Sequence, residues 1–328
     1  MVGSMEQASF AAIAQALRTH DDFIVCGHVS PDGDCIGSVL GMTAILKALG
    51  KEVQPVVALK EPLDAALLSI PGASSLVNVS EAHPAATFIS VDASGDDRLG
   101  QAACALRQGA QFTITLDHHE VSECPADIFH IDPSAPSATC LVWEVAKAAG
   151  VPLGPELAGP CYTGLMTDTG RFQYQNADQR AFALASEMVA TGISVSGIST
   201  AFYQSKTLAA VQMESLVVQH MELLGDGSVA LSFLSQEDMD RYGASYADCE
   251  GAIDVLRSLG QVSVVCILKV RGDEVRGSLR AKDGTDVAAI AGLFGGGGHK
   301  AAAGFTLPGP LDKAIVQVKA ALQGSLGC

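Results

Sequence analysis

The chain has 328 residues, of which 48% are hydrophobic and only 17% are charged. This composition supports large apolar cores and excludes wholesale disorder, and the length is sufficient for two domains. A net charge of −16 leaves little room for the basic face that proteins use to follow long nucleic acids. If the chain binds phosphates, we expect a local pocket in which metal ions or a few donors supply positive charge.

The first half alternates short apolar runs with helical patterns. The runs are nearly continuous in apolar residues, which is typical of strands that are covered on both faces. Strand–helix alternation predicts an α/β domain with a doubly wound, mostly parallel sheet. The expected strands are 23–26, 53–59, 87–92 and 112–117, and the expected helices are 36–49, 96–107, 138–149 and 156–167.

A different pattern begins after about residue 190. Loose helical spacing predicts a connector helix over 207–225. Beyond it we expect a smaller α/β domain, with strands at 228–234, 261–270 and 274–281 and helices at 286–293 and 311–322. The expected organisation is therefore a first domain over 1–190, a linker and connector helix over 191–225, and a second domain over 226–328.

Signals for export or membrane insertion are lacking. No apolar run reaches the ~18 residues of a membrane-spanning helix, and MVGSMEQASF at the N-terminus lacks the basic and apolar regions of a signal peptide. The nine cysteines form no CxxC pair, which argues against a zinc cage and a secreted disulfide framework and favours buried small hydrophobes. We therefore expect a cytoplasmic protein without membrane contacts.

Acidic and imidazole side chains follow the predicted strands of the first half. Open α/β sheets place ligands at the carboxyl ends of their strands. An aspartate there is often only a helix cap or turn former, and a histidine pair is more often a surface or core feature than a ligand. The candidates are His28, Asp32 and Asp34 in CGHVSPDGDCIGS, Asp92 after FISV, Asp117-His118-His119 after FTITL, and Asp168 in TGLMTDTGRF.

Taken together, these residues favour a metal centre. Four aspartates gathered in one crevice would repel one another unless cations neutralised them, and four carboxylates balance two dications. Carboxylates with some imidazole suit Mn²⁺ or Mg²⁺ better than Zn²⁺. Two such ions about 3.5–4 Å apart are a recurring device for phosphate-ester hydrolysis, because they generate hydroxide near neutral pH.

The motifs resemble a known family. HVSPDGDCIGS, VDASGDDRLG, LDHHE and TGLMTDTGRF are similar, in this order, to the four motifs of the DHH phosphoesterases, and GSLR with FGGGGHKAAAG resembles the accompanying DHHA1 domain. The compact two-domain length is most similar to the nano-RNase and pAp-phosphatase subgroup. The resemblance implies one metal on His28, Asp32 and Asp92, and a second on Asp34, Asp92, His118 and Asp168.

The resemblance also implies roles for other residues. His119 would contact the scissile phosphate or assist the leaving oxygen as the catalytic residue. The run GGGGH reads alone as a flexible turn, but glycine N–H groups can also form an anion nest, and an arginine adds a forked donor. The second domain would grip a non-scissile phosphate through Arg280, Gly296, Gly297, Gly298 and His299. A homodimer is expected by resemblance alone.

The predicted activity is hydrolysis of very short oligonucleotides, linear dinucleotides or pAp, with Mn²⁺ favoured and Mg²⁺ or Co²⁺ as substitutes. The alternatives are an inorganic pyrophosphatase or polyphosphatase, a RecJ-like exonuclease on single strands, and a nucleotide sensor without catalysis. The glycine-rich segment disfavours the pyrophosphatase, and the acidic charge disfavours long strands. Occupancy of all six ligand positions disfavours the sensor.

Overall fold

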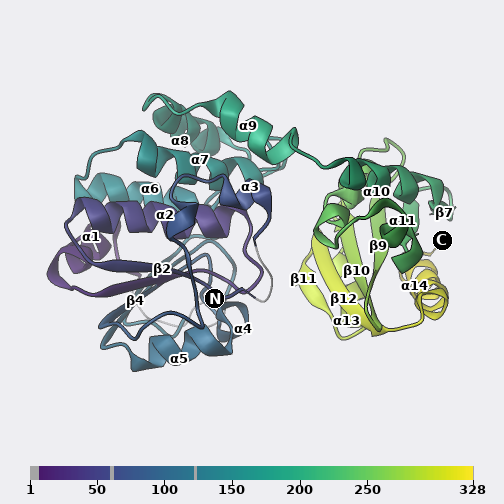
Figure 1. The fold of residues 1–328 in the computed structure, drawn as a ribbon, viewed down its shortest axis with the longest axis horizontal. Coiled ribbons are helices and arrows are strands. Elements are labelled where there is room, and N and C mark those ends of the chain that lie inside the picture. Colours follow the sequence, from purple (N-terminus) through teal and green to yellow (C-terminus); the bar gives the residue numbers. More distant parts are fainter. Residues whose placement is uncertain (1–6, 60–62, 122–123, 328) are drawn as a thin grey trace. The chain divides into compact units, whose positions relative to one another are not determined.

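The computed structural model describes residues 7–59, 63–121 and 124–327. The chain forms two compact units, the first ending at Ser205 and the second beginning at Lys206 (Figure 1). Within the described residues, no helix is both long enough and apolar enough to cross a membrane.

The first unit is built on a six-stranded sheet with the order β3-β2-β1-β4-β5-β6. All of its neighbouring strands are parallel, so the predicted doubly wound sheet is confirmed and is wholly parallel. The strands are β1 (Phe23–Cys26), β2 (Val53–Val57), β3 (Val77–Asn78), β4 (Thr87–Val91), β5 (Phe112–Asp117) and β6 (Ile128–Ile131).

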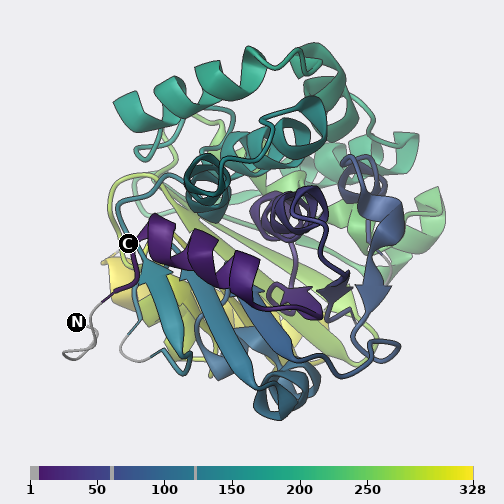
Figure 2. The ribbon, with the colours of Figure 1, turned by 90° about the vertical axis from the view of Figure 1, so that its left-hand side faces the viewer.

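Helices cover both faces of this sheet (Figures 1 and 2). On one face lie α1 (Phe10–Thr19), α2 (Gly33–Ala48), α6 (Ala138–Ala149), α7 (Pro155–Asp168) and α8 (Gln179–Val189), and on the other α4 (Asp96–Leu99) and α5 (Gln101–Gly109). Alternate strand residues accordingly enter two cores: Phe23 and Val25 pack in the core of Trp143, whereas Ile24 and Cys26 pack in that of Leu99. The remaining helices are α3 (Ala65–Leu68), the 3-10 turn η1 (Ala73–Ser75) and α9 (Val195–Tyr203).

The helix predicted over 96–107 is interrupted. Gly100 has φ +81°, and a Cβ there would lie 2.4 Å from Cγ1 of Val29. Only glycine adopts this left-handed conformation readily and leaves that space. The chain therefore forms two helices, α4 and α5, where one was predicted.

Helices α2 and α7 approach each other closely along a row of glycines. A Cβ on Gly33, Gly37 or Gly41 would lie 2.3 Å from Thr167, 2.5 Å from the carbonyl oxygen of Pro160, or 2.9 Å from Cys161, respectively. Residues four apart share one helix face. The row therefore brings the start of α2 against the end of α7, where Asp168 lies.

The second unit is a mixed sheet with the order β11-β12-β10-β9-β8-β7. Only β8 and β9 pair in parallel, and the other pairs are antiparallel. Its strands are β7 (Glu222–Leu224), β8 (Val229–Leu234), β9 (Val264–Arg271), β10 (Glu274–Ala281), β11 (Gly297–His299) and β12 (Ala302–Pro308). Its helices are α10 (Leu208–Gln219), α11 (Gln236–Tyr242), the 3-10 turn η2 (Ala247–Cys249), α12 (Ala252–Arg257), α13 (Val287–Gly292) and α14 (Leu311–Leu326).

The predicted helix over 207–225 ends earlier than expected. Helix α10 stops at Gln219, and residues 222–224 form β7, which pairs with β8. The turn between these strands contains Gly225 at φ +62° and Gly227 at φ +90°, a conformation that favours a hairpin over a continuing helix. Met213 and Val217 of α10 pack in a core of the second unit.

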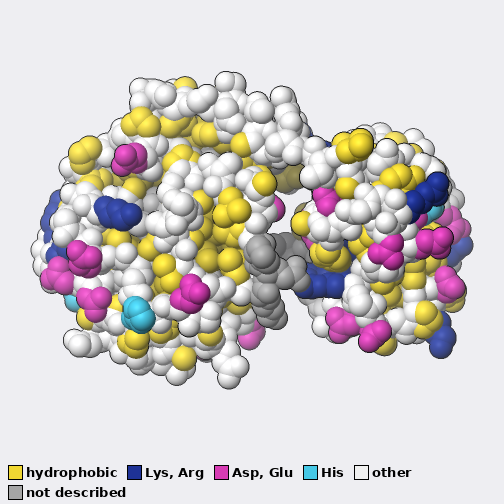
Figure 3. All heavy atoms as spheres, in the orientation of Figure 1, with side chains coloured by type: hydrophobic (Ala, Val, Ile, Leu, Met, Phe, Trp, Pro, Cys, Tyr) yellow, Lys and Arg dark blue, Asp and Glu magenta, His cyan; other side chains and the backbone are white. Residues whose placement is uncertain are grey.

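The described cysteines are all buried, and none of them forms a disulfide bond: Cys26, Cys35, Cys104, Cys124, Cys140, Cys161, Cys249 and Cys266. Their burial is what small hydrophobic side chains in a core would show. Acidic side chains are visible on the surface of both units (Figure 3), in keeping with the net charge of −16.

Candidate metal centre

The predicted ligands gather where the strand order of the first sheet reverses. The chain leaves β1 towards β2 and β3, then returns to place β4 on the other side of β1. Ligands of open α/β sheets bind at such a point, outside the carboxyl ends of the strands. His28 follows β1, Asp92 follows β4 and His118 follows β5, so three neighbouring strands deliver side chains to one edge.

His28 and Asp92 form one side of the cluster. Nε2 of His28 lies 3.2 Å from Oδ2 of Asp92 and 3.8 Å from Oδ1 of Asp32. Asp92 has φ +56°, a left-handed conformation that aspartate tolerates better than most residues. Asp32 has a second role, since its Oδ1 caps α2 by accepting hydrogen bonds from the N–H groups of Asp34 at 3.1 Å and Cys35 at 3.0 Å.

His118 stands at the centre of the other side. Its Nε2 lies 3.7 Å from Oδ2 of Asp34, 3.6 Å from Oδ1 of Asp92 and 3.8 Å from Oδ2 of Asp168. Potential ligand atoms of Asp34, His118 and Asp168 all lie within 4.8 Å of one another. Asp92 directs one oxygen towards His28 and the other towards His118, so it lies between the two groups.

Backbone groups orient these side chains. The N–H groups of Ala138 and Thr139, at the start of α6, donate to Asp34 at 2.6 Å and 3.0 Å. Nδ1 of His118 lies 3.1 Å from the carbonyl oxygen of Ala135; because a carbonyl only accepts, Nδ1 carries the proton. Nε2 faces the carboxylates. Burial lowers the pKa of His118, but the Asp34 and Asp168 carboxylates outweigh it and raise this pKa. A cation bound there would take the place of the Nε2 proton, and a histidine held through Nδ1–H in this way is the arrangement found in metal sites.

The electrostatics of the cluster are unfavourable without a cation. Burial, followed by the nearby Asp34 carboxylate, raises the pKa of Asp168 to about 7. Burial and then Asp34 and Asp32 raise the pKa of Asp92 well above its usual value. Burial lowers the pKa of His28 to about 4, which keeps that imidazole neutral at physiological pH.

The same residues fit a divalent cation. Among the described residues, Nε2 of His28 and Oδ1 of Asp92 are buried polar atoms that make no hydrogen bond. Leaving such atoms unsatisfied is costly, and a bound ion would satisfy both while neutralising the carboxylates. Carboxylate oxygens with neutral imidazoles are ligands suited to Mn²⁺.

Two residues of the compact groups were not predicted as ligands: His119, which groups with Asp92 and His118, and Cys35. Sγ of Cys35 lies within 4.8 Å of ligand atoms of His28 and Asp92. It accepts a hydrogen bond from the N–H of His28 at 3.2 Å, and burial raises the pKa of its thiol well above 9.0. A protonated thiol is a poor ligand. Asp32 belongs to none of the compact three-residue groups found among the described residues.

Asp117 orients His119, a role that the sequence did not reveal. Its Oδ1 lies 2.7 Å from Nδ1 of His119 and accepts from the N–H groups of His118 and His119 at 2.7 Å and 3.1 Å, while Ser94 donates to Oδ2. Burial alone raises the pKa of Asp117, but the His119 contact and Ser94 outweigh it and hold this pKa at about 2. The only hint was its position at the head of LDHHE.

The second unit contains the other predicted residues. Arg280 is half-buried on β10, and its Nη1 donates to the carbonyl oxygen of Leu279 at 2.9 Å. Gly297 and Gly298 belong to β11 and pair with β12, so part of the glycine run is a strand, and Gly298 has φ +142°. A Cβ on Gly296 would lie 2.2 Å from the carbonyl oxygen of Gly304.

The side chain of His299 lies outside the described part of the structure. Strand register nevertheless places residues 280, 302 and 299 in one row across the sheet. Arg280 and the backbone of the glycine run therefore lie near each other on strands joined through β12.

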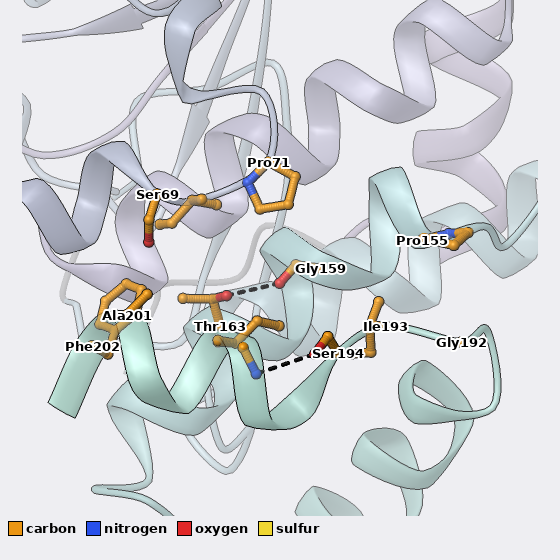
Figure 4. A pocket seen from close by; sticks show the side chains of 13 residues that line it. Ser69, Pro71, Pro155, Gly159, Thr163, Gly192, Ile193, Ser194, Ala201 and Phe202 are labelled. Carbon is orange, nitrogen blue, oxygen red and sulfur yellow. Dashed lines mark hydrogen bonds between the residues drawn. The ribbon is translucent and has the colours of Figure 1, made fainter. Parts of the chain in front are cut away.

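A separate cavity of about 340 Å³ lies between the end of α3, α7 and α9 in the first unit. Apolar groups dominate its lining, which includes Pro71, Ile193 and Phe202, with Thr163 bonded to the carbonyl oxygen of Gly159 (Figure 4). The described lining includes none of the predicted metal ligands. We therefore place the candidate chemistry at the carboxylate–imidazole cluster.

Comparison with known proteins identifies the family. Residues 22–165 match the DHH family N-terminal domain and residues 226–324 match the DHHA1 domain. The chain therefore belongs to the DHH family and carries a DHHA1 domain, which confirms the resemblance inferred from its motifs.

Individual relatives extend over most of the chain. It is 28% identical over 317 residues to a bifunctional oligoribonuclease and PAP phosphatase NrnA of Thermus thermophilus, covering 96% of this chain and 93% of that protein. A protein of the same name from Bacillus subtilis is 24% identical over 299 residues, covering 90% and 92%. The crystal structure of an exopolyphosphatase-related protein from Bacteroides fragilis superposes with a TM-score of 0.89 at 25% identity, covering 99% and 98%.

Proposed function

We propose that the protein is a metal-dependent phosphoesterase that hydrolyses short oligonucleotides and linear dinucleotides to mononucleotides, and pAp to AMP. The observation that carries the proposal is the convergence of carboxylate oxygens of Asp34, Asp92 and Asp168 on Nε2 of His118, at 3.7, 3.6 and 3.8 Å. The two relatives named oligoribonuclease and PAP phosphatase support the substrate class.

The proposed cofactor is a pair of divalent cations, with Mn²⁺ favoured over Mg²⁺ and Co²⁺. Bound there, the cations would lower the pKa of water and offset charge on the phosphoryl oxygens. One would be held by His28, Asp32 and Asp92, and the other by Asp34, Asp92, His118 and Asp168. The buried, unsatisfied atoms of His28 and Asp92 support the first position.

The chain's own residues would then act on the substrate. Asp117 accepts from Nδ1 of His119 at 2.7 Å, so Nε2, on the opposite side of the ring, is the atom that would face the substrate. In the imidazolium form, Nε2–H would donate to a phosphoryl oxygen or protonate the leaving oxygen. We assign catalysis to residues 1–190, a linker and connector to 191–225, and binding of a non-scissile phosphate to 226–328. The binding residues would be Arg280, Gly296, Gly297, Gly298 and His299.

The proposed partners are short nucleotides rather than long nucleic acids, because a net charge of −16 repels a strand that extends beyond a local pocket. We also propose a homodimer. Light scattering coupled to size exclusion checks it: a mass near 33.7 kDa at micromolar concentration would contradict this assignment.

A substrate panel in Mn²⁺ tests the activity. It compares two- to five-residue RNAs, twenty-residue RNAs, pApA, cyclic-di-AMP, pAp, pyrophosphate and polyphosphate at physiological salt. We expect kcat/KM to be highest for the dinucleotide and the shortest RNAs, and pAp to be cleaved. Polyphosphate is included because the Bacteroides fragilis protein is described as exopolyphosphatase-related. Much faster cleavage of pyrophosphate or polyphosphate than of any nucleotide would contradict the proposal.

A further inference from the structure

Asn176 connects two segments that supply the cluster around His118. Its Nδ2 donates to the backbone oxygen of Asp168 at 3.2 Å, to Oδ2 of Asp168 at 3.4 Å, and to the carbonyl oxygen of Pro136 at 3.0 Å. All three partners are acceptors, so the amide nitrogen must face them. The side chain therefore ties the end of α7 to the turn that precedes α6.

That turn holds the other members of the same group. The carbonyl oxygen of Ala135 accepts from Nδ1 of His118, and the N–H groups of Ala138 and Thr139 donate to Asp34. Pro136 lies between these contacts in the sequence. Asn176 thus contacts Asp168 directly and, through Pro136, fixes the turn that orients His118 and Asp34.

The other end of the amide indicates that stability alone does not account for this residue. Among the described residues, Oδ1 of Asn176 is buried and accepts no hydrogen bond. A buried acceptor without a protein partner costs about 1–3 kcal/mol, so the contacts that hold this side chain are those of its donor end. Nδ2 of Asn176 therefore makes all of the hydrogen bonds of this amide, to Asp168 and to Pro136, and Oδ1 makes none to the described residues.

We infer that Asn176 is a positioning residue that orders Asp34, His118 and Asp168 as one cation-binding group. The inference rests on the proposed function, because it assumes that this group binds a divalent ion. It assigns no role to Asn176 in the group of His28, Asp32 and Asp92. Partners that orient metal ligands typically change metal affinity by about 10–100-fold when they are lost.

The test is Mn²⁺ binding to the full chain, measured by electron paramagnetic resonance of the free ion. We expect wild type to bind two ions, and Asn176→Ala to weaken one of them about tenfold or more. That ion should be the one that Asp168→Ala removes, while the ion that His28→Ala removes should keep its affinity. Asn176→Ser retains one donor and should fall between alanine and wild type.

Asn78→Ala is the matched control. Asn78 is also half-buried and donates from Nδ2 to a backbone oxygen, that of Leu59 at 3.2 Å, but it lies on β3 away from the cluster. It should leave both Mn²⁺ affinities unchanged. Melting temperatures of the metal-free variants show whether each protein is folded.

The outcomes separate the two proposals. If wild type binds Mn²⁺ but Asn176→Ala binds both ions as tightly, the positioning role is overturned and the proposed function stands. Equal weakening of both ions, or equal weakening in Asn78→Ala, would also overturn it. If folded wild type binds no divalent ion, the proposed function fails and this inference fails with it.

Discussion

Asp117 contacts His119, the residue to which we assign the catalytic role, through Nδ1 of its ring. We predict that Asp117→Asn lowers kcat at least tenfold, because the neutral amide no longer fixes the His119 ring by a charge-assisted bond from Nδ1, 2.7 Å away. Mn²⁺ affinity should fall much less than kcat, because the substitution changes none of the side chains assigned to the metals. Steady-state kinetics and metal titration measure the two effects.

Ser94→Ala provides the comparison for this variant. It removes only the hydroxyl that donates to the other oxygen of Asp117 and should reduce kcat less than Asp117→Asn. If Asp117→Asn lost Mn²⁺ affinity as strongly as Asp168→Ala, Asp117 would belong to the metal-binding group instead.

The raised pKa of Asp168 predicts how pH affects the metal-free protein. Its pKa is about 7 in the fold against 3.8 as the reference for an unfolded chain. The folded state therefore retains a proton that the unfolded state loses between these values, so this group's stabilisation is complete below about pH 4 and is lost as pH rises through 7.

The isosteric variant Asp168→Asn tests this linkage in EDTA. It should be close to wild type in unfolding free energy at pH 4 and exceed it at pH 8 by more than the ~0.5 kcal/mol typical of a surface change. Denaturant titrations at the two pH values measure this difference. If the variant were less stable than wild type at pH 8, the ionised Asp168 carboxylate would not destabilise the fold, and the linkage argument would be wrong.

At the residue scale, the sequence identified the side chains whose carboxylate or imidazole groups can bind a metal ion. His28, Asp34, Asp92, His118 and Asp168 follow strand ends or motifs, and the structure places them together. The orienting roles assigned to Asp117 and Asn176 were missed because they depend on side-chain contacts that a sequence pattern does not show. Nothing in the segment QYQNAD indicates that Asn176 donates a hydrogen bond to the carbonyl oxygen of Pro136, 40 residues earlier in the sequence.

The α2–α7 contact shows how elements position the cluster. We predict that Gly37→Ala destabilises the protein by about 1–3 kcal/mol, the range for an overpacked core, because the new Cβ would lie 2.5 Å from the backbone oxygen of Pro160. The shift between α2 and α7 should also weaken Mn²⁺ binding. Chemical unfolding and metal titration measure both effects.

Gly324→Ala is the control within a helix. Gly324 lies in α14, and nothing is within 4 Å of a Cβ placed there. Alanine should therefore stabilise the protein by about 0.5–1 kcal/mol through helix propensity. Equal stability of Gly37→Ala and wild type would mean that α2 and α7 tolerate separation.

Element by element, the sequence was most informative where periodicity was strong. The strands expected at 112–117 and 274–281 match β5 and β10, because alternation or continuous apolarity marked them. The break at Gly100 depends on a positive φ and a close approach to Val29, and the end of α10 at Gln219 depends on pairing of β7 with β8. Both are tertiary contacts that local sequence does not show. Strand β12 was missed because its small residues, AAG, carry little strand preference.

At the scale of the whole molecule, all proposed metal ligands lie before Ser205, within a unit that has its own core. We predict that a fragment of residues 1–205 folds, binds Mn²⁺ and melts at a higher temperature when Mn²⁺ is added. Its kcat/KM for a dinucleotide should fall at least tenfold, because Arg280 and the glycine run are absent. Full activity in the fragment would remove the second unit from substrate binding.

The distribution of cysteines gives each unit an internal reporter. Six of the buried thiols lie in the first unit, while Cys249 and Cys266 lie in the second, and burial raises the pKa of Cys266 well above its usual value. With Cys328 replaced by serine, alkylating reagents should mark a thiol only when its surroundings open. Mass spectrometry of the marked peptides during a denaturant series would therefore follow the loss of each half separately, without any attached dye.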